Sequence, residues 1–191
     1  NRSINGPVEI KIYNGVYNTA QSLGTVAGSS PTNTLTFSSL SNDSLQVQIT
    51  SNFTFTGTSN IIIKKLNITN LVVNGDVSNY TVINNQIGAL GWTGANNLTL
   101  KNNYIKSQGA LRFAPFSAAF IEDIMVENNF FAGMTYYVLT NGNITGSNPY
   151  VGWSKVKKPS LKNNTFAFIY MQTRGYNLIN YNSIPYPAGA T

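Results

Sequence analysis

A ten-residue pattern recurs six times along the chain, and it constrains the fold more than any other feature of the sequence. The copies are SNIIIKKLNI from Ser59, SNYTVINNQI from Ser78, NNLTLKNNYI from Asn96, EDIMVENNFF from Glu122, KKPSLKNNTF from Lys157 and GYNLINYNSI from Gly175. Apolar residues stand at the fifth and tenth positions of every copy, and Asn stands at the eighth position of five copies. A repeat of this kind predicts a stack of similar units around one continuous core.

The apolar positions of the pattern predict the core of this stack. They hold Ile63, Val82, Leu100, Val126, Leu161 and Ile179 at position five, and Ile68, Ile87, Ile105, Phe131, Phe166 and Ile184 at position ten. Positions three and five are mostly apolar whereas positions four and six are mostly polar, which is the alternation of a β-strand with one buried face. After a two-residue break, position ten opens a further strand.

The break between the two strands is usually Asn-Asn, and its second residue is the position-eight Asn. These residues are Asn85, Asn103, Asn129, Asn164 and Asn182. Asn tolerates the left-handed backbone that a tight corner requires. Because equal positions of stacked copies lie in register, we expect the position-eight side chains to hydrogen-bond along the stack.

The cores LKNNYI, VENNFF, LKNNTF and VINNQI resemble the coils of a right-handed parallel β-helix with the pectate-lyase-like fold. The copies begin 18 to 35 residues apart, as in a solenoid with loops of unequal length. The resemblance implies an all-β solenoid of about eight coils with Asn-rich corners. The usual crossover rule gives the right-handed winding. A β-sandwich is the alternative fold, since strand patterns alone do not fix the winding.

The N-terminal part of the chain also shows strand patterns, over 8–15, 33–39 and 44–51. Its segments NGPVEIKIYNGVYN and GTVAGSSPTNTLTFSS resemble the opening coils of β-helix domains in large secreted or cell-surface proteins of Bacteroidota-type bacteria. We therefore expect N-terminal coils over 1–58, regular coils over 59–184 with a long loop at 132–156, and a tail or linker over 185–191. We also expect the chain to be part of a longer chain or of an assembly.

Charged residues make up only 9% of the chain, and the net charge of +6 reflects six acidic against twelve basic residues. The basic residues cluster only at Lys155, Lys157, Lys158 and Lys162, which is too sparse for a nucleic-acid interface. The chain has no His and no Cys, so zinc and haem sites of the usual kinds and Ser-His or Cys-His nucleophiles are excluded. We expect no metal, no cofactor and no transmembrane segment, since no apolar run approaches the length of a membrane span.

Carboxylates decide whether a β-helix could act on polysaccharides, because glycoside hydrolysis usually uses two of them at a defined separation. The only cluster is Glu122, Asp123 and Glu127. Glu127 stands at the outward position six, which Lys101 and Lys162 hold in the neighbouring copies, so we predict a surface charge ladder there. In the alternative interpretation, the acidic cluster and Arg112 carry a polysaccharide lyase or hydrolase activity.

Aromatic residues concentrate where the pattern is interrupted. They are Trp92, after the second copy, and Tyr136, Tyr137, Tyr150 and Trp153, in the longest step between copies. Sugar faces stack on aromatic rings while sugar hydroxyls bond to neighbouring amides, so we predict carbohydrate binding by these five residues. The alternative is that the rings pack over the coils and seal an exposed flank.

Asn-x-Ser/Thr sequons give seven candidate N-glycosylation sites: Asn42, Asn52, Asn67, Asn79, Asn97, Asn143 and Asn163. A further sequon begins at Asn1. A chain rich in Asn and Thr also forms sequons by composition alone, so glycosylation and chance stay as alternatives.

These features favour a non-catalytic β-helix module that is secreted or exposed at a cell surface, with an adhesive, structural or extracellular-matrix role. Its expected partners are glycans, bound through the aromatic residues, or other surface proteins. Two alternatives of other classes stay open. One is a carbohydrate-processing enzyme of β-helix fold, and the other is a self-assembling extracellular filament subunit whose coil ends stack between copies.

Overall fold

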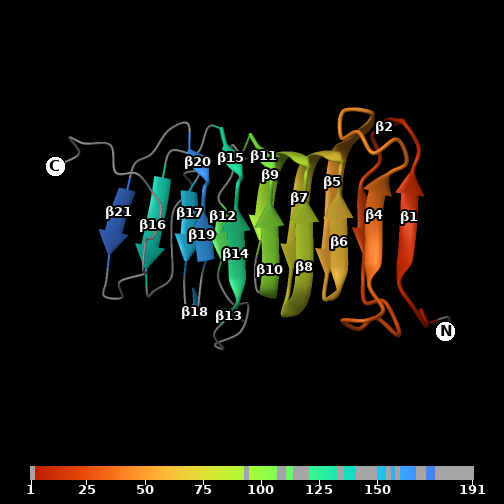
Figure 1. Cartoon of the computed structure of the whole chain (residues 1–191), viewed down its shortest axis with the longest axis horizontal. Helices are drawn as coiled ribbons and strands as arrows, with labels where there is room; N and C mark the ends of the chain where they lie inside the picture. The colour runs from red at the N-terminus through yellow and green to blue at the C-terminus, as the bar shows by residue number, and fades with distance from the viewer. Residues whose placement is uncertain are drawn as a thin grey trace.

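The computed structural model describes residues 3–92, 95–106, 111–113, 121–132, 136–140, 150–153, 156–157, 160–166 and 171–174. Within these ranges every helix or strand element is a β-strand, and the strands stack along the longest axis of the molecule (Figure 1). β-Branched and aromatic residues fill many of the strands, as expected for a pleated, half-buried surface. The all-β class predicted from the sequence is confirmed for the described residues.

Two long sheets carry the stack. The first sheet has the order β1 (Val8–Ile12), β4 (Leu35–Ser39), β6 (Ile61–Lys64), β8 (Val77–Ile83), β10 (Ala95–Lys101), β14 (Ile124–Glu127) and β19 (Ser160–Lys162). The second has the order β2 (Gly15–Tyr17), β5 (Val47–Thr56), β7 (Asn67–Asn74), β9 (Gln86–Trp92), β11 (Tyr104–Ile105), β15 (Phe130–Phe131) and β20 (Thr165–Phe166), and β3 (Gln21–Leu23) also pairs with β5. The chain visits the two sheets in turn, so each passage adds one strand to both.

Two smaller sheets belong to the C-terminal half of the chain. A third sheet has the order β12 (Leu111–Phe113), β17 (Tyr150–Trp153), β16 (Tyr136–Thr140) and β21 (Met171–Arg174), and β13 (Ile121–Glu122) pairs with β18 (Val156–Lys157). All pairings between described strands are parallel. Stacked parallel strands around an apolar interior are consistent with a parallel β-helix.

The pairing register places equal positions of the ten-residue copies side by side. Ile63 is aligned with Val82, which is aligned with Leu100, and the column continues through Val126 to Leu161. The first four are buried and Leu161 is half-buried. The position-ten residues Ile68, Ile87, Ile105 and Phe131 are also buried. Burial at these nine predicted core positions is therefore confirmed, whereas the burial of Phe166 and the whole sixth copy lie outside what the structure describes.

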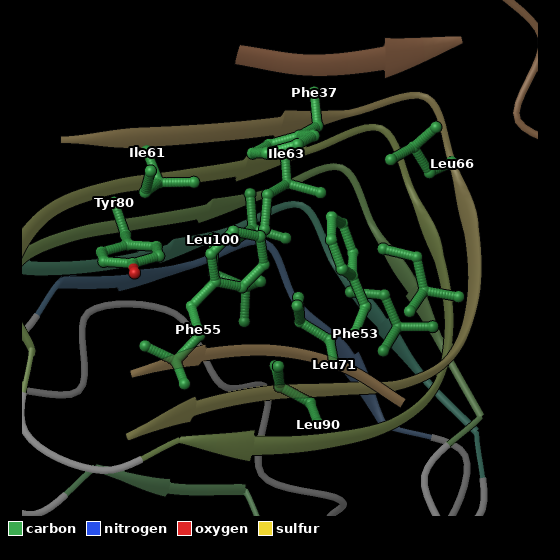
Figure 2. Close-up of a cluster of buried hydrophobic side chains, with 14 of the residues drawn as sticks. Phe37, Phe53, Phe55, Ile61, Ile63, Leu66, Leu71, Tyr80, Leu90 and Leu100 are labelled. Atoms are coloured by element: carbon green, nitrogen blue, oxygen red, sulfur yellow. The ribbon is translucent and has the colours of Figure 1, made fainter. Parts of the chain in front are cut away.

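Side chains of the two long sheets meet in the interior (Figure 2). Ile63 and Leu100 point inward from the first sheet, toward Leu71 and Leu90 of the second (Figure 2). Near the N-terminal end an aromatic cluster fills this space, with the ring of Phe37 5.3 Å from that of Phe53 and 5.6 Å from that of Phe55. Buried rings bring large apolar areas out of water, so this cluster stabilises the coils next to the N-terminal end.

The longest interruption of the pattern differs from its prediction. The segment 132–156 was expected to be one loop, but it contains β16 and β17, which pair with each other in parallel. Trp92, which stands where the pattern is interrupted after the second copy, ends strand β9. The physical reason is local composition, because YYVLT and YVGW consist largely of residues that favour strands. Residues 175–191, with the predicted tail, lie outside the described residues.

Candidate functional site

The position-eight asparagines follow the ends of the first-sheet strands and form what we name the inner asparagine row: Asn85, Asn103, Asn129 and Asn164. The first three are at most 1% exposed and Asn164 is half-buried. Each Nδ2 donates to the backbone carbonyl of position five in the preceding copy, at 2.8–3.0 Å from the oxygens of Ile63, Val82, Leu100 and Val126. Each side chain therefore satisfies a buried carbonyl of the coil before it.

The amides of the inner row also bond to one another. Asn103 Nδ2 donates to Asn129 Oδ1 at 3.0 Å, and Asn103 Oδ1 accepts from both Nδ2 and the backbone N–H of Asn85, at 3.1 and 2.9 Å. The same arrangement joins Asn129 to Asn164. Buried amides with partners on both sides link successive coils and fix their register.

The first copy of the pattern departs from this row, because Leu66 holds its position eight. Leu66 is fully buried, and its backbone N–H donates to Asn85 Oδ1 at 3.0 Å. The preceding coil turns through the longer segment 40–46 between β4 and β5 instead of a two-residue corner. An apolar side chain fits this place because the corner before it is built differently.

A column of left-handed residues precedes the inner row. Position seven holds Lys65, Asn84, Asn102, Asn128 and Asn163, whose φ angles lie between 52° and 58°. Asn is one of the few non-glycine residues that adopt this backbone at low cost. The two residues of the Asn-Asn pair therefore have different roles: the first adopts the left-handed backbone of the corner, and the second forms hydrogen bonds along the stack.

A second row, which the sequence analysis did not find, lies near the start of the first-sheet strands. We name Asn60, Asn79 and Asn97 the outer asparagine row; all three have a positive φ, and Asp123 continues the column. Asn97 Nδ2 donates to Asn79 Oδ1 at 3.0 Å, and Asn79 Nδ2 donates to Asn60 Oδ1 at 2.8 Å. In the sequence this row corresponds to an Asn at position two of three copies. The last two copies hold Lys and Tyr at that position, so it did not stand out as a regular feature.

A charged cluster covers the outer face of the first coils. Glu9 Oε1 lies 3.0 Å from Lys64 Nζ, 3.2 Å from Lys11 Nζ and 2.9 Å from the hydroxyl of Ser38. The hydrogen bond from Lys64, followed by those from Ser38 and Lys11, lowers the pKa of Glu9 to about 2. The cluster joins β1 to β6 across the buried Ser38 of β4.

The acidic residues considered for catalysis lie on or beside the first and smallest sheets. Glu127 pairs with Lys101 at 3.0 Å and is aligned with Lys162, so the predicted ladder contains at least one ion pair. Glu122 belongs to β13, and Asp123 follows it with a φ of 56°. Arg112 belongs to β12 in the third sheet, so the structure places it on a different sheet from Glu127.

The five aromatic residues predicted to bind carbohydrate lie on strands. Tyr136 and Tyr150 are aligned with each other in β16 and β17, and Trp153 is aligned with Leu139 on one side and Phe113 on the other. Tyr137 follows Tyr136 in β16, and Trp92 ends β9. Backbone register thus brings Tyr136, Tyr137, Tyr150 and Trp153 into the third sheet, while Trp92 belongs to the second.

A stacked aromatic pair, which the sequence analysis did not single out, lies on the outer face of the second sheet. The rings of Tyr104 and Phe130 are 5.4 Å apart between centroids and nearly parallel, at 8°. Each residue is 38% exposed. Their faces cover each other, so the pair favours coil stacking, and a ligand would meet mainly ring edges.

The sequons occupy different environments. Asn42, Asn52, Asn97 and Asn163 are exposed, Asn67 and Asn79 are half-buried, and Asn143 lies outside the described residues. Asn52 Oδ1 accepts a 3.0 Å hydrogen bond from Asn70, and Asn42 Oδ1 accepts one from Lys65 at 3.1 Å. The amide nitrogens of Asn79 and Asn97 donate within the outer row, so a glycan there would compete with that row.

Comparisons with family models, curated proteins and solved structures give no match to this chain. The resemblance to Bacteroidota β-helix domains therefore rests on the quoted segments alone. Among the described residues, no group of three or more acidic side chains could hold a metal ion. In the same residues no helix is long and apolar enough to cross a membrane.

Proposed function

We propose that this chain is a right-handed parallel β-helix module of about eight coils, and that it is a non-catalytic structural or adhesive element. We place it outside the cell or at the cell surface. In this proposal the stack is a stiff spacer whose flanks present neutral polar side chains to glycans or to other surface proteins.

One observation carries this proposal, namely the inner asparagine row. Its buried amides join consecutive coils through bonds both to strand ends and to one another. Each amide contributes to holding the next coil in register, which is what a rod that transmits force or spaces other domains requires. The most regular polar side chains of the pattern therefore form hydrogen bonds between coils of the stack.

The charged groups support the same conclusion. Glu9 bonds to Lys64, Ser38 and Lys11, and Glu127 pairs with Lys101, so these two carboxylates are held by cross-coil contacts. A catalytic acid usually has a raised pKa. That of Glu9 is lowered instead, to about 2. Both carboxylates thus suit the attachment of neighbouring strands.

The experiment is to incubate the purified chain with a panel of neutral and acidic polysaccharides and to measure released reducing ends and unsaturated sugars. We expect no product above the buffer control. Beads coated with the chain should nevertheless adhere to films of at least one polysaccharide or surface protein. Turnover that is abolished by E122Q, D123N or R112A would instead establish the enzyme alternative.

A second candidate function is carbohydrate binding on the third sheet. The observation that favours it is the register that aligns Tyr136 with Tyr150 and puts Trp153 between Phe113 and Leu139. Aromatic residues on adjacent parallel strands repeat about every 4.8 Å, which is close to the length of one sugar ring. Tyr136 and Tyr150 stand at equal positions of adjacent strands, so a polysaccharide chain lying along the stack would meet one tyrosine in each of these two coils.

Affinity electrophoresis through gels that contain each polysaccharide tests this second function. We expect the wild-type chain to be retarded by at least one polymer, and Y136A and Y150A, which alter the aligned pair, to lose most of that retardation. The matched control is Y13A, because Tyr13 is an exposed tyrosine at the opposite end of the stack. Equal retardation of the wild type and the two third-sheet variants contradicts a binding site there.

A further inference from the structure

The first strand of the stack leaves one of its edges without a partner strand in the described part of the chain. β1 is the terminal strand of the first sheet and pairs only with β4 there. Val8 N–H donates to Thr34 O, and Ile12 O accepts from Leu40 N–H, so the backbone groups of Val8 and Ile12 face β4. Since backbone directions alternate along a strand, the N–H and C=O groups of Glu9 and Lys11 face the open edge.

The apolar side of β1 is open as well. Val8 and Ile10 are 37% and 42% exposed, although they are aligned with Leu35 and Phe37, which are buried one coil further in. Tyr17, on the first strand of the second sheet, is 37% exposed where the aligned Ile49 is buried. Val8, Ile10 and Tyr17 thus stand at core positions that no further strand covers in the described part of the chain.

We propose that this end is a dimer interface, in which β1 pairs antiparallel with β1 of a second copy about a two-fold axis at Ile10. The sequence VEIKI is complementary to itself in this arrangement. Glu9 lies opposite Lys11 of the second copy, Lys11 lies opposite its Glu9, and Val8 lies opposite its Ile12. Opposite charges directly across an antiparallel pair are favourable, and the isologous arrangement doubles each contact.

The backbone directions fit the same axis. In an antiparallel pair, opposed residues alternate between pairs that exchange two hydrogen bonds and pairs that exchange none. A two-fold axis at Ile10 makes Glu9–Lys11 the bonded pair, and these are the residues whose backbone groups face the open edge. Ile10 and its symmetry mate form the non-bonded pair, in which the side chains approach most closely.

The dimer also continues the interior. Opposed residues of an antiparallel pair project to the same face of a sheet, so Val8, Ile10 and Ile12 of both copies cover one another at the joined ends. Burial of these exposed apolar groups supplies a favourable contribution that charge complementarity alone lacks. The occupant is therefore a second copy of this chain.

Sedimentation velocity over a range of protein concentrations tests the dimer with two charge-reversal variants. We expect the wild type to form a dimer. In E9K and in K11E the dissociation constant of the dimer should rise by on the order of tenfold, because each variant places like charges opposite one another. An equimolar mixture of E9K and K11E restores complementary pairs, so it should form a heterodimer. K106E, the same charge change on an exposed residue away from β1, should dimerise like the wild type.

Folding of the variants is checked by circular dichroism, because Glu9 also bonds to Lys64 within one chain. The variant I10K provides a second test, since it places two like charges on the axis at a position that is already partly exposed. A wild type that stays monomeric at all concentrations overturns the proposal. So does an open-ended polymer, or a mixture of E9K and K11E no more associated than either alone.

Discussion

The inner and outer asparagine rows use the same side chain at the same coil spacing, but in different surroundings. Asn103, in the middle of the inner row, is 1% exposed and bonds to a backbone carbonyl, a backbone N–H and two other amides. Asn79, in the middle of the outer row, is half-buried and bonds to the amides of Asn60 and Asn97. Loss of the Asn103 side chain would therefore leave buried backbone groups without a hydrogen-bond partner, whereas loss of the Asn79 side chain would leave only other amide side chains without one.

An asparagine row therefore stabilises the stack mainly through the buried backbone groups to which its side chains bond. A hydrogen bond between half-exposed amides exchanges with water at little net gain, whereas a buried strand end has no water to replace a lost partner. The inner row therefore specifies how coils stack. The outer row mainly accompanies a left-handed backbone that Asn adopts readily.

The largest effect is expected when Asn103 is replaced by Ala. The N103A change leaves the carbonyl of Val82 and the N–H of Asn85 without their partners in a buried corner. Because each unsatisfied buried group costs about 1–3 kcal/mol, we expect the free energy of unfolding to fall by about 3 kcal/mol or more. Urea unfolding followed by circular dichroism measures this change.

The matched control for N103A is N79A, which removes the same atoms from the outer row. We expect it to lower the free energy of unfolding by only about 0.5–1 kcal/mol, since water can reach the amides that it leaves. Equal losses in N103A and N79A would show that burial does not distinguish the rows.

A second prediction concerns the left-handed corner before the inner row. Asn102 has a φ of 53°, and a β-branched side chain is strained in this region. We expect N102V to lower the free energy of unfolding by about 2 kcal/mol. N102G should change it by less than about 1 kcal/mol, because Gly adopts the same backbone without strain. A Val variant as stable as the Gly variant would mean that the corner can relax to another conformation.

The sequence predicted the inner row but not the outer one, and the reason lies in the copies themselves. Position eight is Asn in five copies and stands in a break between two strands, so both its regularity and its place pointed to a corner. Position two is Asn in only three copies and directly precedes apolar strand residues, so it was assigned no role. Its positive φ at Asn60, Asn79 and Asn97 became visible only in the backbone.

Contacts between distant residues were also beyond the sequence. Glu9 and Lys64 lie in strands separated by β4, and Glu9 stands before the first copy of the pattern, so the repeat does not pair it with Lys64. The strands of the third sheet were hidden for a related reason. Three of its four strands, β12, β16 and β17, come from the two longest steps between copies, where the pattern gives no register, although the strand-forming composition of YYVLT was a usable signal.

A third prediction tests a buried hydroxyl close to the outer row. Tyr80 is 1% exposed, and its hydroxyl donates to the carbonyl of Thr58 at 2.5 Å. We expect Y80F to lower the free energy of unfolding by about 1 kcal/mol, because the buried carbonyl loses a donor. If Y80F costs as much as N103A, the outer corner depends on buried polar bonds as strongly as the inner one does.

The buried hydroxyl of Tyr80 should also make the free energy of unfolding depend on pH. Burial raises the pKa of Tyr80 well above its usual range, whereas an unfolded Tyr titrates near about 10. Above that pH the unfolded state loses the proton first, so the stability that is present at lower pH decreases as the pH rises. Other tyrosines titrate as well, so the measurement is the difference between wild type and Y80F at about pH 8 and about pH 11. The wild type should lose more stability than Y80F over this interval.

The smallest expected effect comes from the first member of the left-handed column. Lys65 is the one member of that column that is not Asn, although its φ is 57°. K65N should raise the free energy of unfolding by about 0.5 kcal/mol, since Asn adopts this backbone at lower cost than Lys does. N84K, the reverse exchange in the next coil at a φ of 58°, should lower it by about the same amount. Opposite signs in the two variants would show that Asn at position seven is selected by the backbone. Equal signs would instead assign the effect to the contact that Lys65 makes with Asn42.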